Sequence, residues 1–443
     1  MKIKIEKLIY EGFGLGHDEN GQAIFVKKSV PSDILEVEII KEKKNFAEAK
    51  IIEITQSSDL RIAPKCPHFN KCGGCDFQNI NYAEQLKFKE EYFKETLERQ
   101  KIATEVLPII PSRAEFFYRN TIAFKFIGEA GQKSLAMYDY LDYKHLIPIG
   151  SCLLQSETAI QIMKLVVEWG NKFENNLYQL RLREGKKTNE YMVEIFTVNN
   201  ILNGQNELKN LLAGIEGIKS IYHCQKSQNE TKRRLIFGTT TISEKVGKYT
   251  FAISPESFFQ TNGANVEVLY DKIKEFAGVK MGDRVLDLFC GTGTIGIYLS
   301  TMAKEVVGVE INQQAINDAK TNAKINKIPN IEFIQSDATK WFSNYCSSVS
   351  ENFEGESSRQ DSNYSIFNTI IVDPPRAGLT NELIESISKL LAPNSQLIYV
   401  SCDPATFARD IIEFEKLGHK LKKVQPLDMF PQTYHLECIG LIK

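Results

Sequence analysis

The chain has 443 residues, 42% of them apolar and 25% charged, a length that indicates two or three domains rather than one hydrophobic core. Its formal net charge of -2 provides no overall attraction for nucleic acid, so any RNA contact must depend on local patches. No apolar run approaches the roughly 20 residues of a membrane span, and nine cysteines, an odd number spread over the chain, do not resemble a disulfide framework. We therefore expect a soluble protein of the cytoplasm.

Residues 1–60 predict a small, OB-like β-barrel. Four β-type runs are separated by two segments that we interpret as turns, EGFGLGHDENG (11–21) and KEKKNF (41–46); the runs are KIEKLIY, AIFVKKSV, ILEVEIIK and AEAKIIEI. Short, evenly spaced strands are typical of such a barrel. The second turn carries three lysines and an aromatic ring. It is either a contact for a phosphate backbone or a solvated hairpin tip.

Residues 61–255 predict a central domain of mixed α and β structure. Residues 82–100 carry apolar side chains at helical spacing, and they predict one long amphipathic helix. Strand-like runs follow, among them TIAFKFI, EYMVEIFTV and YTFAIS. The pattern indicates a β-sheet in this domain but does not predict the order of its strands.

A compact group of cysteines precedes that helix. Cys66, Cys72 and Cys75 enclose a Gly-Gly pair that permits the tight turn required by metal-bound thiolates. Zinc is the first interpretation of such a loop. The fourth ligand is missing locally, and Cys152 is the best distant candidate.

Residues 256–443 predict a Rossmann-like α/β domain. From Val266 onward, five apolar β-type runs alternate with segments of helical composition; the runs are RVLDLFC, EVVGVE, IEFIQSD, TIIVDP and QLIYVSC. This alternation is typical of a doubly wound parallel sheet. Residues 341–366, rich in Ser, Asn and Glu, interrupt the pattern, and we expect a surface loop there.

A glycine turn after the first of these strands indicates a nucleotide-like cofactor. The motif G-T-G-T-I-G begins with Gly291 and Gly293, and Glu310 ends the next strand, where a carboxylate can accept hydrogen bonds from ribose hydroxyls. Both NAD and S-adenosylmethionine carry that ribose. Asp287 suits the cationic methionine end of S-adenosylmethionine, and Asp337 is placed to meet the adenine amino group. An NAD-dependent oxidoreductase is the lesser alternative.

Two further strand ends supply candidate catalytic groups. Asp373 opens the segment D-P-P-R, in which Arg376 stands where amino-group methyltransferases often have an aromatic residue. This favours a ring carbon as the methyl acceptor. C5 of uracil becomes nucleophilic only after a thiolate adds to C6, and Cys402, at the end of QLIYV, can supply that thiolate. We expect a helix N-terminus or a nearby base to lower its pKa. The alternative is a cysteine that only packs.

The reaction at a uracil also requires a base. After methyl transfer the C5 proton must leave before the cysteine can be eliminated. The segment FPQTYHLE (430–437) offers His435 and Glu437, which alternation places on one face of an extended chain.

Five blocks resemble the motifs of the RNA uracil-5-methyltransferase family: FFQTN, DLFCGTGTIG, DPPRAG, VSCDPAT and FPQTYHLE. They cover most of residues 256–443. The resemblance implies Cys402 as nucleophile and Glu437 as proton acceptor. It also implies residues around S-adenosylmethionine and the target base, namely Gln260, Phe289, Glu310 and Asp373. The N-terminal strands resemble the small TRAM barrel of many members, whose family role is RNA binding.

The cysteine loop resembles the iron-sulfur site of the ribosomal RNA branch of this family. That resemblance implies a 4Fe-4S cluster, with zinc as the lesser alternative, on Cys66, Cys72, Cys75 and Cys152. The radical S-adenosylmethionine spacing C-x3-C-x2-C is absent from the sequence, so we expect a structural or RNA-positioning cluster. The branch implies 23S ribosomal RNA as the substrate. We also expect the enzyme to be a monomer. The alternatives are the T-loop uridine of transfer RNA and an iron-sulfur RNA-binding protein with an inactive methyltransferase domain.

Overall fold

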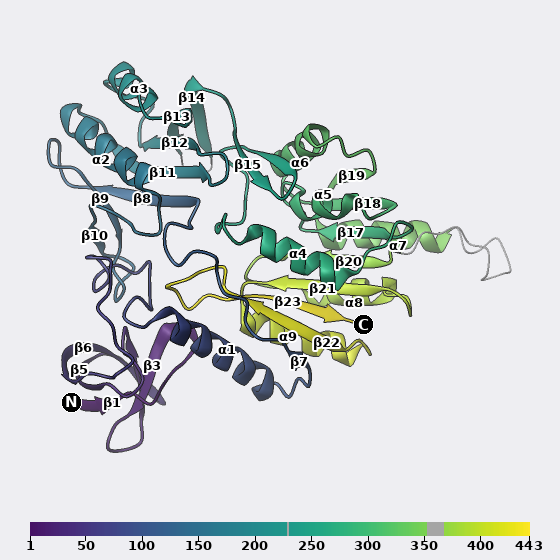
Figure 1. The fold of residues 1–443 in the computed structure, drawn as a ribbon, viewed down its shortest axis with the longest axis horizontal. Helices are drawn as coiled ribbons and strands as arrows, with labels where there is room; N and C mark the ends of the chain where they lie inside the picture. Colours follow the sequence, from purple (N-terminus) through teal and green to yellow (C-terminus); the bar gives the residue numbers. More distant parts are fainter. Residues whose placement is uncertain (228–229, 352–366) are drawn as a thin grey trace.

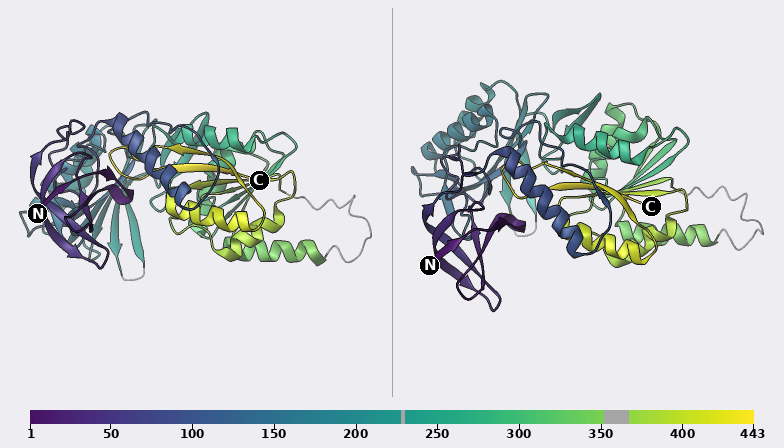
Figure 2. Two further views of the ribbon diagram at one scale, coloured as in Figure 1. Left: turned by 90° about the horizontal axis from the view of Figure 1, so that it is seen from below. Right: turned by 60° about the horizontal axis from the view of Figure 1, so that its bottom comes forward.

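The computed structural model describes residues 1–227, 230–351 and 367–443. The N-terminal and central sheets lie at one end of the molecule and the C-terminal sheet at the other, as Figure 1 and Figure 2 show. The N-terminal sheet has the order β1 (Lys2–Lys4), β5 (Ile34–Glu42), β6 (Phe46–Gln56), β4 (Ala23–Lys27), β3 (Phe13–His17) and β2 (Lys7–Leu8). Its interior is small and aliphatic, with Ile24, Val26, Leu35 and Val37 among the buried residues.

Strand β3 corrects the interpretation of residues 11–21 as a turn. Gly14 and Gly16 alternate along this strand and face the barrel interior, where both are buried. A Cβ on Gly14 would come within 2.0 Å of the Ser29 hydroxyl oxygen, and one on Gly16 within 2.5 Å of the Lys4 carbonyl oxygen. The glycines therefore permit close packing inside a strand, although their sequence pattern is that of a loop.

The central sheet has seven strands, in the order β10 (Leu146–Pro148), β9 (Ser134–Tyr138), β8 (Thr121–Ile127), β11 (Leu177–Gly185), β12 (Glu190–Thr197), β13 (Ile218–Lys226) and β14 (Thr231–Gly238). Helices α2 (Glu157–Lys172) and α3 (Gln205–Ala213) cover one face, and Trp169 is buried in that core. The hairpin of β15 (Ile242–Val246) and β16 (Tyr249–Ile253) leads from this layer to the C-terminal sheet.

The C-terminal sheet has eight strands, in the order β19 (Ile331–Gln335), β18 (Glu305–Glu310), β17 (Arg284–Leu288), β20 (Thr369–Val372), β21 (Gln396–Ser401), β23 (Glu437–Ile442), β22 (Leu421–Leu427) and β7 (Glu105–Val106). The first five are parallel, and β23 is antiparallel to both of its neighbours. The chain runs outward from β17 to β19 and returns to β20, so strand order reverses between β17 and β20. Ligands bind at such a reversal in open α/β sheets.

Helices cover both faces of this sheet, as the Rossmann-like prediction requires. One core contains residues of α4 (Val266–Ala277), α5 (Thr294–Ser300) and α6 (Gln313–Ile325). The other contains residues of α1 (Tyr82–Arg99), α7 (Ala338–Glu351), α8 (Asn381–Leu390) and α9 (Pro404–Lys416). The predicted helix over 82–100 is confirmed by α1, which begins where the Asn81 side chain accepts a hydrogen bond from the Glu84 amide.

Helix α7 corrects the surface loop expected at residues 341–366. The helix continues to Glu351, because Trp341 and Phe342 bury their rings in the core and the Trp341 ring stacks on that of Tyr345 at 4.9 Å. Residues 352–366, the rest of the expected loop, lie outside the described residues. The Ser- and Asn-rich composition concealed the apolar face of this helix.

Candidate active site

The glycine turn between β17 and α5 opens the C-terminal edge of the sheet. Phe289, Gly291 and Gly293 have φ angles of 61°, 52° and 76°, so the chain bends sharply there. A Cβ on Gly293 would lie 2.5 Å from the Phe333 ring. Only glycine permits this close approach, which leaves the backbone of the turn free to face a ligand.

Asp287 presents a buried carboxylate directly below this turn. One of its oxygens accepts a hydrogen bond from the Gly296 amide at 2.9 Å, whereas Oδ1 is buried and has no partner among the described residues. Burial raises the pKa of this carboxyl to about 8, with Asp373 and Glu310 adding to the effect. A buried carboxylate with an open acceptor atom suits a cationic ligand group.

Glu310 and Asp337 follow the next two strands at the same edge. The Glu310 carboxylate accepts hydrogen bonds from the Gly291 amide at 3.2 Å and the Asn312 amide at 2.8 Å, so it connects the glycine turn to the start of α6. Asp337 accepts one from the Lys340 amide at 3.1 Å, at the beginning of α7. Both side chains thus have a structural role as helix or turn caps, and both line the edge predicted to hold the cofactor.

Gln260 and Asp373 face each other across the strand reversal. The Gln260 amide group donates to Asp373 Oδ2 at 3.4 Å, and its backbone carbonyl accepts a hydrogen bond from the Asn120 side chain at 2.8 Å. The guanidinium of Arg183, a buried residue of β11, donates to the carbonyls of Pro255 and Ser257. The central sheet thereby positions the segment that carries Gln260.

Cys402 and Glu437 lie at adjacent strand ends. Ser401 of β21 is paired with Cys438 of β23 in antiparallel register. Cys402, which follows Ser401, therefore lies opposite Glu437, which precedes Cys438. Burial raises the pKa of the Cys402 thiol to about 12, and the Glu437 carboxylate is the next cause. The expectation of a lowered pKa is therefore wrong, because desolvation by burial, together with the nearby carboxylates, outweighs the effect of Arg376.

His435 and Glu437 differ as candidate bases. Glu437 is buried, and desolvation followed by the Asp373 charge raises its pKa well above the ordinary range. Burial lowers the pKa of His435 to about 3, and Arg376 adds to this. His435 Nε2 lies 3.2 Å from Arg376 Nη2, so the imidazole is neutral and its acceptor nitrogen already has a donor.

Helix α1 holds the segment that leads to Glu437. Lys89 forms a fully buried ion pair with Asp428 at 2.8 Å and donates to the Phe430 carbonyl at 3.1 Å. Tyr82 donates to the other oxygen of Asp428 at 2.9 Å. Sequence reasoning missed these residues, since a lysine and a tyrosine on an amphipathic helix ordinarily lie at its solvent edge.

The N-terminal barrel also contacts the catalytic edge. Tyr10, in the short 3-10 helix Tyr10–Gly12, donates a hydrogen bond of 2.5 Å to Asp403 Oδ2. Asp403 follows Cys402 and caps the N-terminus of α9 by accepting from the Thr406 amide. No signal in the sequence links these two positions, which are 393 residues apart.

A family model described as tRNA (Uracil-5-)-methyltransferase matches residues 81–443. The chain belongs to this family. A TRAM domain model matches residues 1–52, which confirms the prediction for the barrel. The enzyme therefore transfers a methyl group from S-adenosylmethionine to uracil C5 in RNA.

Similar proteins agree with this assignment. An uncharacterized RNA methyltransferase of Clostridium tetani is 36% identical, with 98% of this chain and 94% of the relative covered. One of Clostridium acetobutylicum is 34% identical over 100% of this chain and 96% of the relative. The tRNA (uracil-54, C5)-methyltransferase of Pyrococcus abyssi, solved with S-adenosyl-L-homocysteine, is 28% identical, covers both chains completely and has a TM-score of 0.76.

The four predicted cluster cysteines of this methyltransferase gather between the barrel and the central sheet. Cys66 and Cys152 pack against the small apolar cluster that contains Cys75. Burial raises the pKa of the Cys152 thiol to about 11, and Cys72 and Cys66 add to the effect through their charge. Among the described residues, no group of three or more His, Cys, Asp or Glu side chains has the arrangement of a metal site.

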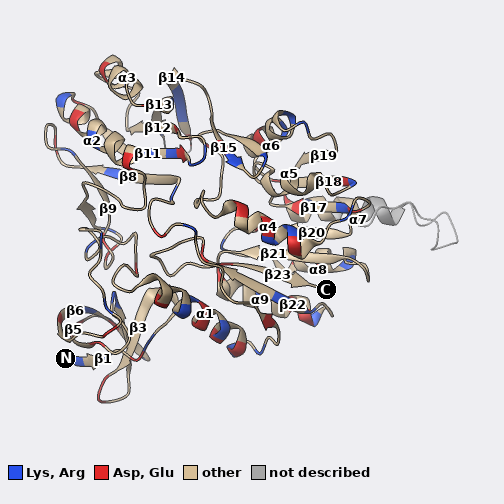
Figure 3. Ribbon diagram, viewed as in Figure 1, with Lys and Arg blue, Asp and Glu red and all other residues tan. Residues whose placement is uncertain are grey.

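Charged residues of both signs lie along the elements outside the site (Figure 3). Acidic and basic residues are interspersed along α1 and α2, as Figure 3 shows, whereas β14 carries a short basic stretch. No helix in the described part of the chain is long and apolar enough to cross a bilayer.

Proposed function

We propose that the enzyme methylates its uridine through a covalent adduct between Cys402 and C6, with Glu437 as the acceptor of the C5 proton. The juxtaposition of the Cys402 thiol and the buried Glu437 carboxyl at adjacent strand ends carries this proposal. S-adenosylmethionine, when bound, supplies an electrophilic methyl group. The residues proposed to surround it and the target base are Gln260, Asp287, Phe289, Gly291, Gly293, Glu310, Asp337 and Asp373.

Burial sets the starting protonation of the groups in this sequence of steps. It raises the pKa of Glu437 well above its ordinary range, so this carboxyl must lose its proton before it can accept the one from C5. Cys402 holds its proton until substrates bind, since its pKa is about 12. Asp287, with a pKa of about 8, and Asp373, with a pKa of about 7, ionise readily beside a cationic ligand.

The bond changes follow from these groups. The Cys402 sulfur loses its proton to a site carboxylate or to water and bonds to C6, which makes C5 an enolate carbon. C5 takes the methyl group, and the carbon–sulfur bond of the donor breaks. Glu437 then removes the C5 proton as the C6–sulfur bond breaks, and Cys402 is released as a thiolate.

RNA containing 5-fluorouridine tests this mechanism. Fluorine at C5 cannot leave as a proton, so wild-type enzyme should form a stable adduct after methyl transfer, visible as a shifted band on a denaturing gel. C402S should form none, whereas E437Q should accumulate adduct on ordinary uridine RNA as well. A wild-type enzyme that transfers radiolabelled methyl without any adduct refutes the covalent route. A wild-type enzyme that binds RNA without transfer supports the inactive-domain alternative.

We propose 23S ribosomal RNA as the substrate, with the T-loop uridine of transfer RNA as the second candidate. The cysteine set, which resembles that of the ribosomal RNA branch, supports the first. The similarity to the Pyrococcus abyssi enzyme supports the second. Mapping 5-methyluridine in both RNAs from a deletion strain, and after complementation with wild type or C402S, distinguishes them, because only the true target loses and regains its methyl group.

We also propose a 4Fe-4S cluster on Cys66, Cys72, Cys75 and Cys152. Four mutually interacting thiols provide the donor chemistry that such a cluster needs. Lys28 supplies a nearby positive charge, since its ammonium donates to the carbonyls of Phe69 and Cys72. The cluster would fix the loop between the barrel and the central sheet. Iron, zinc and sulfide analysis of anaerobically purified protein and of C75S tests this, and zinc without sulfide would favour the alternative.

A further inference from the structure

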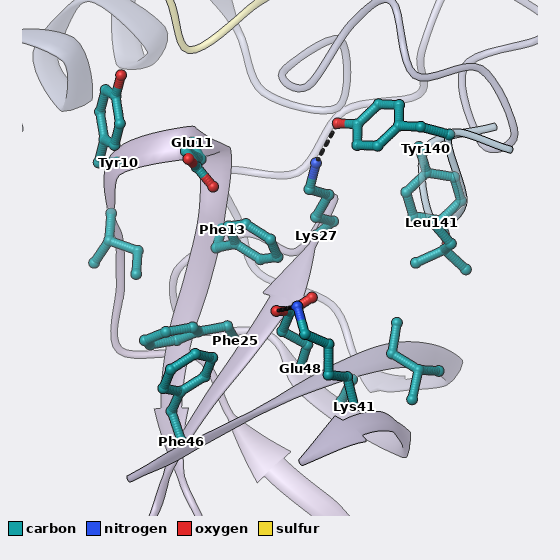
Figure 4. A pocket seen from close by; sticks show the side chains of 14 residues that line it. Tyr10, Glu11, Phe13, Phe25, Lys27, Lys41, Phe46, Glu48, Tyr140 and Leu141 are labelled. Carbon is teal, nitrogen blue, oxygen red and sulfur yellow. Dashed lines mark hydrogen bonds and ion pairs between the residues drawn. The ribbon is translucent and has the colours of Figure 1, made fainter. Parts of the chain in front are cut away.

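The outer face of the N-terminal barrel carries a cavity of about 430 Å³. Strands β3 to β6, the 3-10 helix and the segment from Tyr140 to Tyr143 of the central layer enclose it. Figure 4 shows the rings of Phe13, Phe25 and Phe46 with the ammonium groups of Lys27 and Lys41 around this space. The lysine-bearing turn at 41–46, ambiguous in the sequence, lies at its edge.

The aromatic rings of the cavity are not part of the barrel core. Along β4 the buried residues are Ile24 and Val26, whereas Phe25 and Lys27 alternate onto the other face. Phe46 occupies the corresponding outer position of β6. Outward positions on a barrel are usually polar, so three half-buried phenylalanines beside a cavity indicate a binding surface.

The geometry of these rings suits a flat ligand. Phe25 and Phe46 are stacked, with centroids 5.0 Å apart and an interplanar angle of 26°, and Phe13 lies 6.1 Å from Phe25. Nucleobases stack on such platforms. The cavity of about 430 Å³ has room for one nucleotide.

The charged groups of the cavity suit the phosphate of the same ligand. The Lys27 ammonium lies 5.0 Å from the Phe13 ring and donates to the Tyr143 hydroxyl at 3.1 Å. Lys41 pairs with Glu48 at 2.6 Å in an exposed contact that a phosphate can replace. Glu11 is the other carboxylate of the lining. The lining thus carries two ammonium groups and two carboxylates, and a phosphate that displaces Glu48 would bind the ammonium groups of Lys27 and Lys41.

The cavity adjoins the catalytic edge. Tyr10 lines it, and the hydroxyl of the same side chain donates to Asp403, the neighbour of Cys402. An RNA strand whose target uracil reaches Cys402 therefore has a flanking nucleotide within reach of the barrel. We propose that this cavity binds one unpaired nucleotide of the substrate RNA by stacking on Phe25 and Phe46, an inference that rests on the enzyme acting on RNA.

A fluorescent probe tests the stacking directly. The chain has two tryptophans, Trp169 and Trp341, and both are buried, so neither ring can stack on RNA. Subtracting the wild-type signal isolates the emission of the tryptophan that F46W introduces. We expect unmodified 23S RNA transcript to quench the F46W emission, and S-adenosylmethionine alone to leave it unchanged. Transfer RNA transcript serves as a second arm, since the proposal requires quenching by whichever RNA is methylated.

Kinetics of the full-length enzyme provide the second readout. F25L/F46L and K27Q should each raise the KM for RNA, the double variant by about tenfold or more, while kcat and S-adenosylmethionine affinity stay within about twofold. K50Q, on β6 outside the cavity and paired with Glu38, is the matched control and should leave KM unchanged. Thermal unfolding checks that the barrel stays folded.

The outcomes separate this proposal from the enzyme's function. Absence of methyl transfer by wild type refutes the function. Methyl transfer by wild type with unchanged KM in the folded F25L/F46L variant, or no quenching of F46W by the methylated RNA, refutes the nucleotide site. Equal losses in K27Q and K50Q show general electrostatic attraction and also refute it.

Discussion

The buried ion pair between Lys89 and Asp428 leads to a quantitative prediction for K89M. Both side chains are 0% exposed, and the ammonium nitrogen lies 2.8 Å from Asp428 Oδ1. Methionine fills the space of the lysine stem but leaves a buried carboxylate whose remaining donors, among the described residues, are the Tyr82 hydroxyl and the Phe430 amide. Removing one partner of such a pair costs about 3–5 kcal/mol, because the remaining charge stays buried without compensation. We expect that loss in the free energy of unfolding.

Equilibrium unfolding in urea, followed by circular dichroism, measures this loss. K94M is the matched control, since Lys94 lies on the same helix in an exposed pair with Glu90 and should cost less than about 1 kcal/mol. The double variant K89M/D428N removes both charges and should lose less than the sum of the single variants. A loss below about 1 kcal/mol in K89M, or equality with K94M, refutes the reasoning.

Three further predictions concern the active site. Alkylation of Cys402 in the enzyme without ligands should accelerate about tenfold per pH unit from pH 7 to 9, because the pKa of the thiol is about 12. Peptide mass mapping measures the alkylation rate. A rate that reaches a plateau near pH 8 contradicts the prediction. Binding of S-adenosylmethionine at about pH 7.5 should release up to one proton, because Asp287, with a pKa of about 8, ionises beside the cation. The affinity for S-adenosylmethionine should therefore rise with pH. Calorimetry in several buffers measures the proton release, and D287N should lack the release by Asp287. Y10F loses the bond to Asp403 and should slow adduct formation about tenfold with unchanged cofactor affinity; equal rates in quenched-flow assays exclude a positioning role.

The C-terminal fold was predictable because its signals are local. Apolar β-type runs alternate with helical segments over residues 256–443, and each run forms a strand of the parallel sheet. Helix α1 was equally clear from its apolar spacing. The glycine turn at Gly291 and Gly293 follows its strand directly, so the sequence alone places it at the sheet edge.

Strand β3 and helix α7 were not predicted, because their amino-acid composition is typical of loops. The glycines of β3 have the pattern of a loop, yet they enter a strand because the barrel wall leaves no room for a Cβ. Helix α7 consists largely of weak helix formers, yet Trp341 and Phe342 anchor it in the core. Local propensity is a small energy, and in α7 the burial of apolar surface exceeds it.

The sequence by itself determined which chemical groups are present and in which order along the chain: a thiol, carboxylates, a glycine turn and four further cysteines. Only the tertiary structure decided the pKa values and the contacts of these groups. The Cys402 thiol has a raised pKa rather than a lowered one because Glu437 and Asp373 approach it from other strands in a desolvated site. The fold also brings Tyr10 of the barrel to Asp403, although the two residues are 393 positions apart in the chain. Desolvation and charge proximity depend on contacts between distant segments, which no local pattern encodes.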